Sequence, residues 1–254
     1  MQALNKTLLH IAPHCDDELI GAPAILMGLR DHGWSIVNLV SSLGSPDQRN
    51  RRSREVELAC QKAGFELKIF QKPLDDPIAE DDFQASVRRS VAEISQVIEE
   101  VAPAIIMTAS PLDKHLGHQA MGEALLRALE GNPLASQVVW LWGLWADLPY
   151  PTIAHCFGED YLVEIEDCLA LHAGELERND YRRLVGGRAM MNSILGPERV
   201  FGFGSCGVDQ NQYVELIGEF YLYESDWWSG SPRWLELANP LNGTRSHIRN
   251  PRSH

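Results

Sequence analysis

The chain has 254 residues, of which 44% are hydrophobic and 22% charged, and its formal net charge is −13. This composition is typical of a soluble globular protein, and the length is enough to bury a substantial core. The acidic excess argues against nucleic acids and anionic membrane surfaces as partners, because both require a basic face. No segment is apolar for long enough to span a bilayer, so we expect no membrane insertion.

The cysteines and the amino terminus indicate the cellular compartment. Five cysteines are widely spaced and form no CxxC pair. Secreted domains of this kind would show denser, paired cysteines. The first residues also lack the charged and then apolar design of a signal peptide. We therefore expect a cytoplasmic protein.

Strand-like and helix-like segments alternate over the first two-thirds of the chain. Strands are predicted at residues 7–12, 35–41, 66–70, 103–108 and 137–144. Helices are predicted at residues 19–31, 51–63, 82–101 and 118–129. This alternation is typical of an α/β fold with a mostly parallel sheet and helices on both of its faces.

The pattern weakens towards the carboxyl terminus. Trp140 and Trp142 alternate on one face of the last predicted strand, where core packing is the favoured interpretation. One long helix is predicted at 161–184, and the tail at 226–254 has no clear period. We expect a single domain over residues 1–254, with 1–145 as the sheet-forming core and 146–254 as a carboxyl-terminal elaboration.

The first candidate site is the run His14-Cys15-Asp16-Asp17-Glu18. It follows an apolar strand-like run and precedes a predicted helix. This is the carboxyl end of the first strand, where open α/β sheets bind ligands. One imidazole and one carboxylate can bind a divalent metal, and the second carboxylate is then free to accept a proton from water.

A second candidate cluster is Asp113-Lys114-His115-Leu116-Gly117-His118. It also follows an apolar strand-like run and opens a predicted helix. Two clusters of this kind can supply three protein ligands and leave one metal position open, as in catalytic zinc sites. Capping and turn formation are the alternative roles, but both clusters following strands favours the metal.

The segment 47–54 is locally basic and enters a predicted helix. A solvated helix entrance is one interpretation. The other is that one arginine reaches the active site and binds substrate oxygens with its planar fork.

Three segments resemble motifs of the LmbE-like, or PIG-L, family of zinc-dependent N-acetylglucosaminyl deacetylases. Residues 12–18 (APHCDDE) resemble the family's AHPDDE motif, and residues 113–118 (DKHLGH) resemble its DxHPDH motif. Between them, residues 52–65 (RSREVELACQKAGF) resemble its RxxEAxxAAxxLGV helix. The resemblance covers residues 7–145 and implies a Rossmann-like fold with a zinc ion at the carboxyl edge of the sheet.

The resemblance also implies roles for individual residues. Asp16 corresponds to the general base, His115 to the histidine that stabilises the oxyanion or protonates the leaving group, and Arg52 to a substrate-contacting arginine. A ligand set of this type also serves other divalent metals. The implied ligands of one zinc ion per chain are His14, Asp17 and His118.

The implied activity is the hydrolysis of a linear amide. The substrate class is an amino sugar or a related small polar metabolite that carries an N-acyl group, most simply an N-acetyl group. One alternative is an amidase that acts on a thiol conjugate or on a natural-product biosynthetic intermediate. A metal-binding family member without catalysis is another. The resemblance further implies assembly into a homo-oligomer.

Two positions depart from the family motifs. Cys15 replaces a proline, and it is either an inert buried cysteine or a thiol that binds metal or is readily oxidised. Leu116 and Gly117 replace a Pro-Asp pair. The missing aspartate would orient His115, and Asp113 is the nearest substitute in the sequence.

Overall fold

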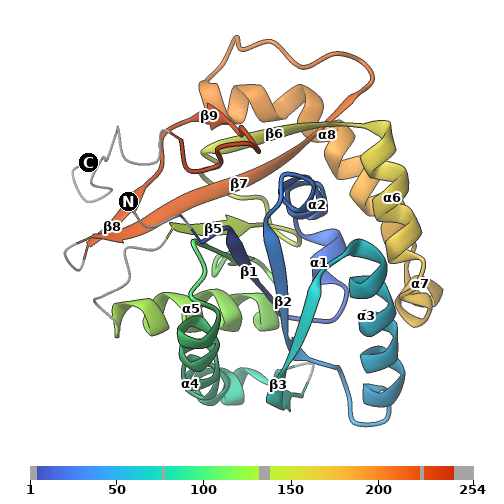
Figure 1. Cartoon of the computed structure of the whole chain (residues 1–254), viewed down its shortest axis with the longest axis vertical. Helices are drawn as coiled ribbons and strands as arrows, with labels where there is room; N and C mark the ends of the chain where they lie inside the picture. The colour runs from blue at the N-terminus through green and yellow to red at the C-terminus, as the bar shows by residue number, and fades with distance from the viewer. Residues whose placement is uncertain (1–4, 76–77, 132–137, 224–225, 243–254) are drawn as a thin grey trace.

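The computed structural model describes residues 5–75, 78–131, 138–223 and 226–242 and confirms the α/β architecture (Figure 1). Its strands are β1 (Thr7–Ala12), β2 (Ser35–Ser42), β3 (Glu66–Leu74), β4 (Ile105–Ala109), β5 (Val138–Trp142), β6 (Ile153–Gly158), β7 (Gln212–Tyr223), β8 (Asp226–Ser229) and β9 (Arg233–Trp234). Within the described residues they form one sheet in the order β3-β2-β1-β4-β5-β7-β6-β9, and β8 pairs with β7.

Helices cover both faces of this sheet. They are α1 (Asp17–Ile20), α2 (Pro23–Asp31), α3 (Arg49–Ala63), α4 (Phe83–Val101), α5 (Leu116–Glu130), α6 (Glu159–Leu169), α7 (Ala173–Arg178) and α8 (Tyr181–Phe201), with a short 3₁₀ turn η1 (Glu80–Asp82) before α4. Helices α4 and α5 pack on one face and α1, α2, α3 and α6 on the other (Figure 1). Helix α8 lies against β6 and β7.

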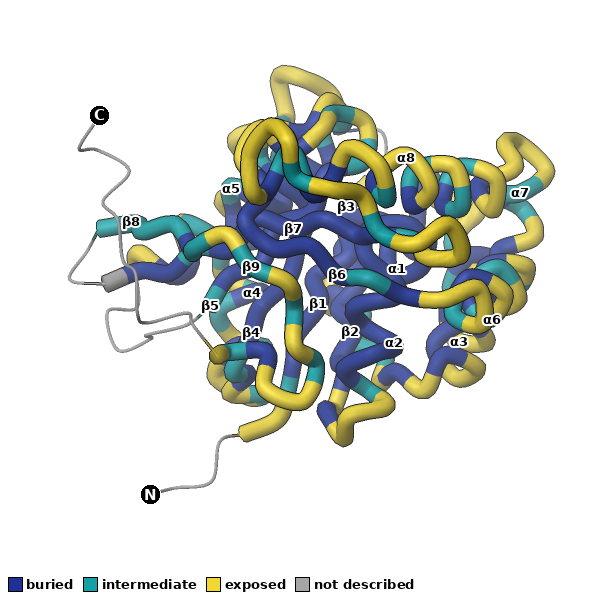
Figure 2. The backbone as a smooth tube through the Cα atoms, turned by 90° about the horizontal axis from the view of Figure 1, so that it is seen from above, coloured by how far each residue is buried: buried dark blue, intermediate teal, exposed yellow. Residues whose placement is uncertain are grey.

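Strand β1 lies at the centre of the parallel part of the sheet. It pairs in parallel with β2 on one side and β4 on the other, so that Leu9 lies between Val37 and Ile106. Strands buried on both faces read as nearly continuous apolar runs, which is why this part was predictable. Figure 2 shows these central strands enclosed by the helices. The carboxyl ends of β1 and β4 are adjacent, and each leads into one of the two candidate clusters.

Two predicted helices are wrong in their extent. The segment 19–31 is divided into α1 and α2, because Gly21 packs against the indole of Trp142 and Pro23 starts a new helix. The segment 161–184 contains parts of three helices, α6, α7 and α8. Asn179 has extended backbone angles between α7 and α8, and asparagine favours such breaks because its side chain competes for backbone hydrogen bonds.

The carboxyl-terminal part contains strands that the sequence pattern did not reveal. Strand β7 runs antiparallel between β5 and β6, and β8 and β9 form within the aperiodic tail. The predicted strand at 137–144 is observed as β5, although residue 137 lies outside the described residues. Residues 243–254 of the predicted tail also lie outside the described residues. Among the described residues, no helix has the length and apolar character needed to cross a bilayer.

A buried ion pair fixes this added layer of strands. Glu219 in β7 is fully buried, and both of its carboxylate oxygens accept hydrogen bonds from Arg233 in β9, each at 2.7 Å. The indole of Trp140 in β5 donates a further hydrogen bond to this carboxylate at 3.0 Å. The carboxylate therefore connects β7 and β9 with β5, whose Trp140 lies 79 residues before Glu219 in the sequence.

Replacing Arg233 with leucine should destabilise the protein by about 3–5 kcal/mol, because the charge of Glu219 would stay buried without its partner. Urea unfolding measures this loss. Arg182→Leu is the control, since its ion pair with Asp180 is solvent-exposed and should contribute no more than about 1 kcal/mol. Equal losses in the two variants would contradict this account of the ion pair.

Candidate active site

The first loop of the site follows β1 and includes His14 and Asp17. Oδ2 of Asp17 accepts a hydrogen bond from the backbone N–H of His14 at 2.8 Å and lies 3.2 Å from Nδ1 of the same residue. Both side chains are buried. Because these contacts join residues only three positions apart, the His14 ring is oriented by residues of its own loop.

The second loop connects β4 to α5. His115 caps the amino terminus of α5, and its Nδ1 accepts a hydrogen bond from the backbone N–H of Gly117 at 3.2 Å. A neutral ring with an accepting Nδ1 carries its proton on Nε2. Asp113 accepts hydrogen bonds from the backbone N–H groups of Leu144 at 2.8 Å and Trp145 at 3.2 Å. This carboxylate therefore attaches the second loop to the residues that follow β5.

The two loops bring three imidazoles together. Each of His14, His115 and His118 has a ring nitrogen within 4.8 Å of a ring nitrogen of the other two residues. The ring centroids are separated by 4.6, 5.2 and 5.1 Å. Nε2 of His118 lies 3.4 Å from Oδ1 of Asp17. The carboxylate of Asp17 thus contacts imidazoles from both loops.

These distances are compatible with a zinc site. Two donor atoms on a tetrahedral zinc ion lie about 3.3 Å apart, and Asp17 lies 3.2 Å from His14 and 3.4 Å from His118. Burial would raise the pKa of Asp17, but the adjacent imidazoles hold it well below its usual range. Asp17 is therefore ionised, as a metal ligand must be.

Asp113 does not take the place that the sequence suggested for it. Its Oδ1 accepts a hydrogen bond from the backbone N–H of His115, but its Oδ2 faces Nδ1 of His118 at 3.5 Å. A carboxylate behind a ligand imidazole orients the ring and raises its basicity. Asp113 is thus placed to support His118 and not the ring of His115.

Asp16 and Arg52 line the same cavity as the imidazoles. Burial and the neighbouring charge of Asp17 raise the pKa of Asp16 to about 6. Arg52 is buried, with its Nε 3.2 Å from a carboxylate oxygen of Glu175. Of the two interpretations of the basic segment, the structure fits the one in which an arginine reaches the site. The roles of Asp16 as base and Arg52 as substrate contact stay predictions.

Four further residues line the cavity and were not predicted as site residues: Ile20, Trp145, Arg178 and Tyr181. The Trp145 and Tyr181 rings meet edge to face at 6.4 Å, and Arg178 donates a hydrogen bond to the Tyr181 hydroxyl at 2.8 Å. Among the last three, only Trp145 could have been suspected from the sequence, because it follows the carboxyl end of β5, where α/β sheets bind ligands. Arg178 and Tyr181 come from α7 and α8 and belong to no motif.

Cys15 is fully buried in the first loop. Burial raises the pKa of its thiol well above the usual range. Because the thiolate is the form that binds metal and reacts with oxidants, this environment favours the inert buried cysteine over the alternatives.

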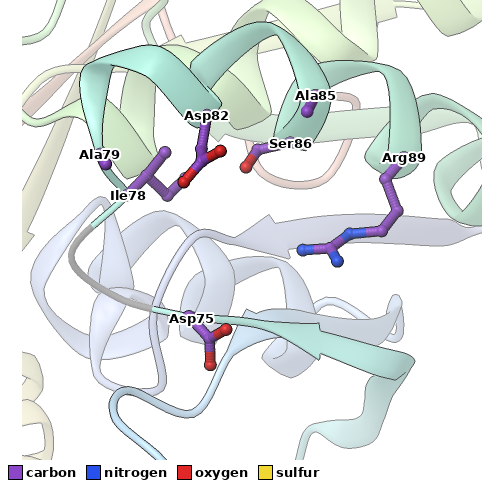
Figure 3. A pocket seen from close by; sticks show the side chains of 7 residues that line it. All are labelled: Asp75, Ile78, Ala79, Asp82, Ala85, Ser86 and Arg89. Carbon is purple, nitrogen blue, oxygen red and sulfur yellow. The ribbon is translucent and has the colours of Figure 1, made fainter.

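A separate hollow lies between the end of β3 and the start of α4 (Figure 3). Carboxylates of Asp75 and Asp82 and the guanidinium of Arg89 line it, together with Ser86 and small apolar side chains. None of the residues predicted for the site lies there. The candidate active site is therefore the cavity at the imidazole cluster.

Comparison with known families agrees with the motifs. The model of the PIG-L family, described as GlcNAc-PI de-N-acetylase, matches residues 9–129, which contain both loops and helix α3. Residues 9–129 belong to the PIG-L family. A search of curated protein sequences finds no significant match to the chain.

Solved structures similar to this chain share its fold. The A40926 pseudoaglycone deacetylase Dbv21 is 17% identical with a TM-score of 0.65, over 87% of this chain and all of that one. The N,N'-diacetylchitobiose deacetylase from Pyrococcus horikoshii is 14% identical with a TM-score of 0.63, over 84% and 83% of the two chains. The 4-carboxy-2-hydroxymuconate hydratase GalB from Pseudomonas putida is 15% identical with a TM-score of 0.63, over 84% and 95%. One fold thus carries different reactions.

Gly117→Ala should disturb the imidazole cluster. A Cβ atom at this position would lie 2.7 Å from Nε2 of His14 and 3.2 Å from Nδ1 of His115. We expect the added methyl group to displace His14 and weaken zinc binding by about 10-fold or more, as measured by competition with a chromophoric chelator. Gly187→Ala in α8 is the control, because its Cβ would meet no atom within 4 Å. The same zinc affinity in both variants would argue against this packing.

Proposed function

We propose that this protein is a zinc-dependent hydrolase that removes an N-acyl group, most simply acetyl, from an amino sugar or a related small polar metabolite. The PIG-L segment and the fold shared with two deacetylases support the reaction class. The shared fold alone would not decide it, because a hydratase has the same fold.

The observation that carries the proposal is a second carboxylate in the metal-binding cavity. Asp17 contacts His14 and His118, whereas its neighbour Asp16 lines the cavity with a raised pKa. A structural zinc site is closed by four protein ligands and has no use for an additional basic group. A catalytic site needs an open position and a base.

The proposed division of labour follows from these positions. His14, Asp17 and His118 hold the zinc ion, which when bound supplies the Lewis acidity that activates water and polarises the amide carbonyl. Asp16 accepts the proton of the attacking water and returns it to the leaving amine.

His115 has a separate role, although its ring lies within metal-binding distance of the other two. Its Nδ1 accepts the hydrogen bond from Gly117, so the neutral ring carries a proton on Nε2 and has no free lone pair for a metal. The Nε2–H group instead donates to the carbonyl oxygen as negative charge develops there.

The remaining lining favours a polar substrate. Arg52 and Arg178 provide hydrogen-bond donors, and Trp145 and Tyr181 provide aromatic surface. A few placed polar groups beside aromatic walls fix the orientation of a small ligand. An N-acetylated amino sugar satisfies both requirements, and the neighbour named for N,N'-diacetylchitobiose acts on such a compound. An amidase for larger acyl groups remains distinguishable by its products, because only deacetylation releases acetate.

Asp16→Asn should retain zinc and lower the hydrolysis rate by about 10²–10⁴-fold, because the amide cannot accept the proton from water. The measurement pairs elemental analysis of the variant with amine and acetate release from N-acetylglucosamine and its glycosides.

Cys15→Ala is the matched control for this experiment. Cys15 is the adjacent buried residue of the same loop and does not line the cavity, so its replacement should keep the rate within a few-fold. Unchanged hydrolysis in Asp16→Asn would show that this carboxylate is not the base. Equal loss in both variants would point to damage of the loop instead.

A further inference from the structure

The imidazole of His118 rests against a tryptophan from the protein core. The indole of Trp142, at the end of β5, meets the His118 ring edge to face, with centroids 5.1 Å apart and planes at 82°. Trp142 is fully buried and is not among the residues that line the cavity.

A hydrogen-bond relay fixes the indole in place. Nε1–H of Trp142 donates to Nε2 of His10 at 3.2 Å, and Nδ1 of His10 lies 2.8 Å from Oδ1 of Asn38. The Asn38 amide nitrogen faces Sγ of Cys60 at 3.5 Å, so its oxygen accepts from His10. Burial lowers the pKa of His10, which keeps the ring neutral and its Nε2 able to accept.

The backbone of Gly21 packs closely against the indole. A Cβ atom at Gly21 would lie 2.7 Å from Cε2 and 2.8 Å from Cδ2 of Trp142. The backbone of Gly21 has ordinary negative φ and ψ angles, so the close approach of the indole, and not the backbone conformation, is what requires a glycine here. The indole is thus held between the end of α1 and the relay from β1 and β2.

The contacts of His118 with carboxylates leave one freedom of its ring open. Asp17 faces Nε2 at 3.4 Å and Asp113 faces Nδ1 at 3.5 Å, and both contacts are longer than ordinary hydrogen bonds, so they hold the ring only loosely. Rotation of the ring about its Cβ–Cγ bond is therefore restricted only weakly by these contacts, and this terminal torsion of histidine is intrinsically broad. A nitrogen lone pair lies in the ring plane, so this rotation decides whether Nε2 points at a metal.

We propose that Trp142 is a positioning residue that sets the plane of the His118 ring for metal binding, held in place by His10, Asn38 and Gly21. This inference rests on the metal site of the proposed function. His14 and His115 also border His118, but they belong to the same cluster. Trp142 is the neighbour of the ring that is anchored in the core.

Strand β5 contains a matched control two residues away. Trp140 is also fully buried and also donates one indole hydrogen bond, in this case to Glu219 at 3.0 Å. Its partner lies in the ion pair with Arg233, and among the described residues Trp140 makes no ring contact with the imidazole cluster. Trp140→Phe and Trp142→Phe therefore remove the same chemical group from the same strand.

The experiment measures zinc affinity by chelator competition and the visible absorption spectrum of the Co²⁺-substituted protein, together with the melting temperature of the metal-free protein. Both Phe variants should lower the melting temperature. Trp142→Phe alone should weaken zinc binding, by about 2- to 10-fold as expected for an aromatic contact, and alter the Co²⁺ spectrum. Gly21→Ala, which keeps every hydrogen-bonding group but presses on the indole, should do the same.

Unchanged zinc affinity and an unchanged Co²⁺ spectrum in Trp142→Phe would overturn the positioning role while leaving the metal site intact. Equal changes in Trp140→Phe would also overturn it, because the effect would then be general destabilisation. If Trp142→Phe does not fold, Gly21→Ala decides the question. Failure of the parent protein to bind zinc or Co²⁺ would instead refute the proposed function.

Discussion

The carboxylate of Asp17 is the contact on which the site depends. It meets His14 within its own loop at 3.2 Å and His118 from the second loop at 3.4 Å. The contact exists because β1 and β4 are adjacent parallel strands whose carboxyl ends lie at the same edge of the sheet. These carboxylate–imidazole contacts connect the two loops, and the same atoms are spaced as zinc ligands would be.

The sequence predicted the amino-terminal core because its signals are local. The buried strands β1 and β4 read as apolar runs, and the motif residues His14, Asp17 and His118 sit at fixed offsets from them. Their convergence followed from the rule that parallel strands end at one edge. The break at Gly21 was not predictable, because it depends on an indole from β5 that is distant in the sequence.

The carboxyl-terminal half was predicted poorly for a physical reason. Strands β7 and β9 are stabilised by non-local pairing and by the buried Glu219–Arg233 ion pair, neither of which leaves a periodic pattern. The same half completes the cavity through Arg178 and Tyr181. In the proposed function, the motif loops supply the catalytic groups, and elements that no motif marks supply the groups that contact the polar part of a substrate.

The most direct test of this account is the metal content of the purified full chain, measured by elemental analysis beside a His118→Ala variant. We expect about one zinc ion per chain, and its loss in the variant because one of three ligands is removed. A parent protein that holds no metal, even after zinc is added and the excess removed, would contradict the account. So would a variant that retains zinc with unchanged stoichiometry and affinity.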